Sequence, residues 1–111
     1  MYIEDDVWKN YLDNSFELFI LVGKSFLESY KDFKKKIERE FDLKEIDLIH
    51  EDLHSIKGIT LNLGMSKLDI AVEEALRYIR KDILDKDSIE NMLDIFSSTY
   101  IELENIIKKD H

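Results

Sequence analysis

The sequence predicts an all-α protein, an up-down antiparallel four-helix bundle with a short extra helix at its N-terminus. Proline is absent and glycine occurs only three times among 111 residues, so the chain lacks most of the turn residues that β-rich proteins need. Apolar residues recur three or four positions apart along most of the chain, which is the spacing of one helix face. The predicted loops are short, and short loops make consecutive helices antiparallel.

The N-terminal part of the chain contains two predicted helices. The first is short and is interrupted near residues 13–15, whose side chains prefer caps and turns. From Phe16 onward an apolar stripe runs to Ile37, so it predicts one long second helix. The apolar residues of the short helix are Val7, Trp8, Tyr11 and Leu12.

The third predicted helix carries most of the residues of functional interest. It covers about residues 44–63 and ends at Gly64, a residue type suited to a helix C-terminal cap. Ser66, with Asp69 three residues later, is a capping pattern for the start of the fourth helix. This fourth helix is expected to end near Ile83.

The last predicted helix begins with a second capping pattern, Asp87 followed by Glu90. Its apolar stripe runs to Ile107. Lys108 and Lys109 come at its end, where positive charge interacts favourably with the helix dipole. The sequence therefore predicts four substantial helices.

Composition and charge exclude several classes of protein. Hydrophobic residues make up 44% of the chain and aromatics 11%, enough for one folded domain over residues 1–111, which no repeat or linker-like stretch divides. The net charge of −9 disfavours nucleic-acid binding, and the absence of cysteine excludes disulfides, zinc thiolates and thiol catalysis. No apolar stretch is long enough to span a membrane, and the N-terminus does not resemble a signal peptide. We therefore expect a soluble, cytoplasmic protein whose partners are proteins.

His54 lies on the side of the third helix that is turned away from its apolar stripe. In helical projection it points about 130° from the centre of that stripe. Lys57 and Gly58 flank it one turn further along, and Leu61 lies almost directly beyond it. Because a glycine inside a helix costs about 1 kcal/mol relative to alanine, Gly58 suggests the close approach of another molecule. Lys57 supplies an ammonium that can bind anionic oxygens.

These residues also have plain structural interpretations. A helical histidine is commonly a solvated or core-edge residue, and Lys57 could be an ordinary solvated lysine. Leu61 could widen the core stripe or form an apolar docking surface beside His54.

The motif around His54 resembles the signature of histidine-containing phosphotransfer domains. That signature is a histidine, any residue, an aliphatic residue, lysine and glycine, with an apolar residue and glycine five and six positions later. The run His54-Ser55-Ile56-Lys57-Gly58, followed by Asn62-Leu63-Gly64, matches every one of these positions. The similarity extends to the number of helices and the place of the motif in the chain, so it covers residues 15–108. Leu61 departs from the small residue common in the family, and His50 has no counterpart among the family's functional residues.

The resemblance implies a phosphorelay intermediate in two-component signalling, a stoichiometric carrier and not an enzyme. His54 would accept a phosphoryl group from a phospho-aspartyl receiver domain, or directly from a kinase ATP-binding domain, and pass it to another receiver. A neutral imidazole is a suitable nucleophile for this step, and Lys57 would assist it. No cofactor is expected in the chain itself, because the Mg²⁺ belongs to the partner receiver.

The expected partners are response-regulator receiver domains and a sensor or hybrid histidine kinase, and the chain itself is expected to be a monomer. Gly58 would admit the receiver. The predicted docking residues are Gly58, Leu61, His50 and Glu51.

A competing interpretation treats the same histidine as a metal ligand. His50-Glu51-Asp52-Leu53-His54 is a literal H-E-x-x-H, the zinc metallopeptidase motif. Glu73 and Glu74 follow 19 and 20 residues after His54, where some such peptidases place a third ligand. However, a lysine ammonium on the histidine side disfavours a dication, and no strand is predicted that could align a substrate. We therefore expect no metal site.

A third hypothesis is a helical interaction module without phosphate chemistry. Loss of the acceptor histidine or of the adjacent glycine would favour it. Both residues are present.

Overall fold

The computed structural model describes residues 1–4, 7 and 15–109 of the chain. All regular secondary structure within these residues is helical, which confirms the predicted all-α class. The helices are α2 (Phe16–Ser29), α3 (Phe33–Asp42), α4 (Ile46–Thr60), α5 (Ser66–Ile79) and α6 (Lys86–Lys109). The extra N-terminal helix, predicted over Val7, Trp8, Tyr11 and Leu12, lies outside the described residues except for Val7, which is buried.

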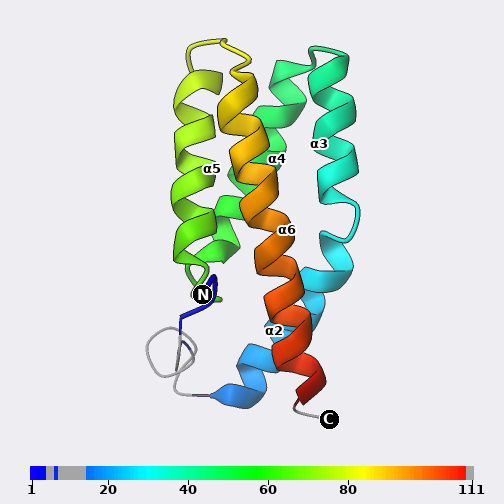
Figure 1. The fold of residues 1–111 in the computed structure, drawn as a ribbon, viewed down its shortest axis with the longest axis vertical. Coiled ribbons are helices and arrows are strands. Elements are labelled where there is room, and N and C mark those ends of the chain that lie inside the picture. The colour runs from blue at the N-terminus through cyan, green and yellow to red at the C-terminus, as the bar shows by residue number, and fades with distance from the viewer. Residues whose placement is uncertain (5–6, 8–14, 110–111) are drawn as a thin grey trace.

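Helices α3, α4, α5 and α6 pack around a common apolar core (Figure 1). α4 packs against α3 and α5, while α6 packs against α5 and α3 and also against α2. Because each of the four therefore touches two neighbours, they enclose the core on all sides. None of the described helices is both long and apolar enough to cross a membrane. The largest fully buried side chains come from every helix and from the turn after α4: Phe19, Phe26, Ile37, Ile49, Leu53, Ile56, Leu63, Met65, Leu68, Leu76, Met92 and Leu103.

The predicted long second helix is in fact two helices, because α2 ends at Ser29 and α3 begins at Phe33. The break surrounds Tyr30, whose ring centroid lies 4.8 Å from that of Phe26 and 5.7 Å from that of Phe33. Both phenylalanines also contact Phe96 on α6, at 6.3 Å and 4.7 Å between centroids. The break lets this aromatic cluster pack against α6. The apolar spacing continues through it, which is why the prediction of one continuous helix is wrong.

Three helices end in the same hydrogen-bonded turn. Lys44, Gly64 and Asp82 have positive φ angles of 57°, 68° and 58°, the left-handed conformation that commonly follows a helix. The residue after each one donates its N–H to the carbonyl five positions earlier, at 2.9, 2.8 and 2.9 Å respectively. These bonds satisfy helix carbonyls that would otherwise lack a donor.

Helices α4 and α5 are shorter than predicted. α4 ends at Thr60, ahead of the predicted residue 63, and α5 ends at Ile79, ahead of Ile83. In both cases the closing turn begins inside the predicted helix. Its N–H groups still bond to helix carbonyls, so helical spacing of apolar residues persists into the turn.

Two predicted N-terminal caps are wrong. No side chain caps α5, and the Ser66 hydroxyl donates to the Glu4 carboxylate instead. Asp87 lies inside the first turn of α6. The carboxylate that accepts the N–H of Ser88, at 2.9 Å, belongs to Asp85.

Candidate functional site

The predicted site residues lie on the polar face of α4. The buried residues of this helix, on its opposite side, are Ile49, Leu53, Ile56 and Thr60. His54 is exposed, as the helical projection predicts, and so are His50, Glu51 and Gly58. We call these four residues the His54 face. Leu61 follows directly after α4 and is 49% exposed, so it adds an apolar side chain next to the end of this helix.

The His54 imidazole is free to react. Among the described residues, no side chain or backbone group forms a hydrogen bond or an ion pair with it. The same holds for His50 and Glu51, so neither of these neighbours orients the imidazole. An exposed histidine without a partner offers a ring nitrogen to an incoming reagent at no cost in lost interactions.

Gly58 leaves open space one turn from His54. A Cβ atom built at Gly58 would meet no heavy atom of the described residues within 4 Å. A Cβ at Gly64 would instead lie 2.5 Å from Cγ2 of Val7, and Gly64 also has a positive φ. The second glycine of the motif is therefore required by packing and backbone conformation, whereas packing among residues 1–4, 7 and 15–109 gives no reason for Gly58.

Lys57 forms ion pairs with α5. Its Nζ lies 3.2 Å from Oδ1 of Asp69 and 3.6 Å from Oε2 of Glu73, while its side chain remains 30% exposed. Arg80 binds Glu73 at 2.8 Å, and this guanidinium lowers the pKa of the Glu73 carboxyl, with a smaller contribution from Lys57. The Lys57 ammonium is thus held at the junction of α4 and α5.

The buried Thr60 also contributes to this junction, a role that the sequence analysis did not identify. Its hydroxyl donates to Oδ1 of Asp69 at 2.8 Å. Asp69 therefore accepts hydrogen bonds from both Thr60 and Lys57. A threonine on the apolar stripe of a helix is a signal for such a contact, because a buried hydroxyl needs an acceptor.

The described residues provide no third ligand for a metal ion bound by His50 and His54. Within residues 1–4, 7 and 15–109, no group of three or more histidine or carboxylate side chains is placed to hold a metal ion. Glu73, one of the carboxylates considered from its spacing, is occupied by Arg80 and Lys57.

Comparison with known proteins identifies no relative. No family model matches the chain, and neither a curated protein nor a solved structure matches it. A functional assignment therefore depends on the chemistry of α4 and its surroundings.

Proposed function

We propose that this chain is a histidine phosphotransfer protein that carries a phosphoryl group on His54 between receiver domains of a two-component system. The observation that carries the proposal is the exposed, unpartnered imidazole beside the open space at Gly58. The match of residues 54–64 to the family signature supports the same assignment.

The proposed reaction is a reversible transfer between a carboxylate and an imidazole. A lone pair on one ring nitrogen of His54 attacks the phosphorus of a partner's aspartyl phosphate. A P–N bond forms, the P–O bond to the aspartyl group breaks, and the carboxylate leaves with its electron pair. The reverse step delivers the phosphoryl group to the aspartate of a second receiver. The receiver supplies the Mg²⁺ and the acidic pocket.

Lys57 assists by charge in this proposal. A phosphoryl group on His54 presents two or more anionic oxygens, which compete with Asp69 and Glu73 for the Lys57 ammonium. The partial exposure of the Lys57 side chain supports this role, because a buried ion pair would have no access to the group.

The remaining features of the proposal follow the family. The helices run up and down in antiparallel order, preceded by a short N-terminal helix, and the protein acts as a cytoplasmic monomer. The receiver docks over Gly58 and contacts Leu61, His50 and Glu51. The phosphoryl donor is a phosphorylated receiver, or the ATP-binding domain of a sensor or hybrid kinase.

The decisive experiment is phosphotransfer from receiver domains loaded with radiolabelled phosphoryl groups. Wild-type protein should acquire label that is lost in acid and kept in alkali, as expected for a P–N bond. His54→Gln should acquire none. His50→Gln is the matched control, because His50 is exposed one turn away on the same face. As a docking variant it should be labelled more slowly than wild type, but it should still acquire the acid-labile label because the acceptor His54 is intact. Label retained by His54→Gln, or no label on the wild-type chain from any receiver tested, would refute the proposal.

A further inference from the structure

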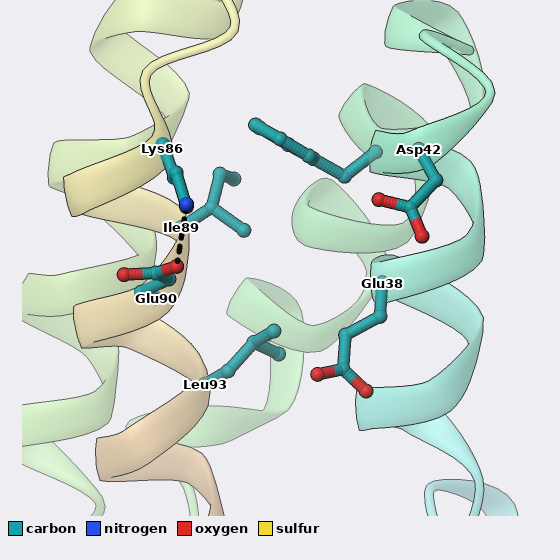
Figure 2. Close-up of a pocket in the computed structure, with 7 residues that line it drawn as sticks. Glu38, Asp42, Lys86, Ile89, Glu90 and Leu93 are labelled. Carbon is teal, nitrogen blue, oxygen red and sulfur yellow. Dashed lines mark ion pairs between the residues drawn. The ribbon is translucent and has the colours of Figure 1, made fainter.

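A groove of about 440 Å³ separates the C-terminal part of α3 from the first turns of α6 (Figure 2). It is lined by Glu38, Phe41, Asp42, Lys86, Ile89, Glu90 and Leu93. In Figure 1, α4 lies behind the gap between α3 and α6. The groove therefore belongs to a different side of the bundle from the exposed face of α4, and nothing in the phosphotransfer proposal uses it.

The α3 wall of the groove carries two carboxylates without counter-ions. Glu38 and Asp42 are four positions apart, which places them on one side of the helix, and both are exposed. Figure 2 shows their carboxylate groups extending from α3 into the gap. Neither forms an ion pair with any residue that the structure describes.

The α6 wall does not balance this charge. Lys86 is the cation on this wall, and its Nζ lies 3.7 Å from Oε1 of Glu90 on the same helix. The groove thus contains three carboxylates and one ammonium that is already paired. Its electrostatic preference is for a cation from outside the chain.

The floor of the groove is apolar. Ile89 and Leu93, which are 3% and 4% exposed, belong to the core beneath it, and Phe41, which is only partly buried against the same core, presents apolar surface to the groove. An occupant that fits the groove places hydrocarbon over Phe41 and positive charge on the α3 wall. The carboxylates disfavour phosphate-bearing partners such as nucleic acids, which they repel.

We propose that this groove binds an arginine side chain from an apolar segment of a partner protein. The methylene stem of an arginine packs on Phe41, and its planar guanidinium reaches the carboxylates of Glu38 and Asp42. Arginine fits better than lysine because its donors form a fork that can serve two carboxylates, and because the guanidinium is more weakly hydrated than an ammonium. Apolar neighbours of the arginine cover the edges of the groove.

The test uses a blocked Leu-Arg-Leu tripeptide and its neutral analogue, in which citrulline replaces arginine. Binding is followed in the full-length protein by ¹⁵N NMR chemical shifts. Saturable shifts are expected at Phe41, Ile89 and Leu93 with the arginine peptide, and much smaller ones with the citrulline peptide. Equal binding of the two peptides, shifts centred elsewhere on the molecule, or no saturable shift would overturn the proposal.

A pair of charge-matched variants separates this site from general attraction to an acidic protein. The double substitution Glu38→Gln and Asp42→Asn should weaken binding of the arginine peptide by about fivefold or more. The control, Glu17→Gln with Glu74→Gln, removes the same charge from exposed positions on α2 and α5 and should leave the affinity unchanged. Equal weakening by both double variants would show that net charge alone attracts the peptide. Because no histidine is altered, the outcome does not depend on the phosphotransfer proposal.

Discussion

Glu40 on α3 and Asp52 on α4 bury two carboxylate oxygens at the interface between these helices. Glu40 is 3% exposed. Oε1 of Glu40 and Oδ2 of Asp52 are both buried and accept no hydrogen bond from any described group. Lys36 satisfies only the other oxygen of Asp52, at 2.9 Å. A proton on Oε1 of Glu40, donated to Oδ2 of Asp52, satisfies both buried oxygens, so we infer that the Glu40 carboxyl is protonated in the folded bundle below about pH 7.

This pair should make the stability of the bundle depend on pH. Burial, and then Asp52, raise the pKa of Glu40 from 4.5 to about 7, with Glu45 acting in the same direction and Lys36 in the opposite one. The folded state therefore holds a proton that the unfolded state releases near its ordinary pKa. The stabilisation is complete below about pH 4.5 and is lost as the pH rises through about 7.

The substitution Glu40→Gln should remove this dependence, because an uncharged amide can donate to Asp52 at every pH. The wild-type protein should lose stability between pH 5 and pH 8, and the variant should not. The unfolding free energy of the variant minus that of wild type should therefore rise by about 2 kcal/mol from pH 5 to pH 8. Urea unfolding at the two pH values measures the difference. Glu38→Gln, on the exposed side of the same helix, should show no such gain. A Glu40→Gln gain no larger than that of Glu38→Gln would contradict the protonation of Glu40 in the folded bundle.

The burial of Glu40 shows what sequence reasoning can and cannot find. Helical spacing, together with the scarcity of proline and glycine, predicted the all-α class, and spacing predicted the exposure of His54. It could also have flagged Glu40, which continues the buried series of Phe33 and Ile37 on α3. What spacing cannot supply is the partner: the meeting of Glu40 with Asp52 depends on how α3 packs against α4.

The helix ends show a second limit. Only one of the three left-handed residues that close α3, α4 and α5 is a glycine, and this one, Gly64, was predicted as a cap. Lys44 and Asp82 adopt the same conformation without that sequence signal. Likewise, the pairing of Lys57 with Asp69 could not be predicted, because no local pattern tells which residue of α5 faces α4.

Substitutions at Gly58 should change the stability of the protein and its rate of phosphotransfer in different ways. Since a Cβ at this position meets no heavy atom of the described residues within 4 Å, Gly58→Ala should raise the unfolding free energy by about 0.5–1 kcal/mol through helix propensity. Gly58→Gln should also fold normally, yet it should lower the rate of phosphotransfer at least about tenfold, because its side chain fills the space used by the receiver. Urea unfolding and a phosphotransfer time course measure the two effects. Normal transfer by Gly58→Gln would show that the receiver does not use the space beside Gly58.

Gly64→Ala provides the opposite case. A methyl group here would meet Val7, and the residue has a φ of +68°. Left-handed strain costs about 1–2 kcal/mol for a residue with a Cβ, and the clash adds to it. We therefore expect Gly64→Ala to lower stability by about 2 kcal/mol or more, while any Gly64→Ala protein that remains folded transfers at the normal rate. A neutral effect on stability would remove the structural role of this glycine.

Lys57→Ala tests whether the Lys57 ammonium leaves its ion pairs with Asp69 and Glu73 to bind a phosphoryl group on His54. The side chain is partly exposed, so the loss of its contacts with Asp69 and Glu73 should cost less than about 1 kcal/mol of stability. The rate of phosphotransfer should fall about tenfold or more, because charge that develops on the phosphoryl oxygens loses the ammonium that the proposal assigns to it. Rates measured at saturating receiver separate this effect from weaker docking.

The controls for Lys57 distinguish local charge from net charge. Lys57→Arg keeps a cation at this position and should recover most of the rate, whereas Lys24→Ala removes a lysine from an exposed position on α2 and should leave the rate unchanged. If Lys57→Ala transfers as fast as wild type, the contacts with α5 are the whole function of this lysine. His54 would then act without a cation from position 57, and charge neutralisation would fall to the receiver.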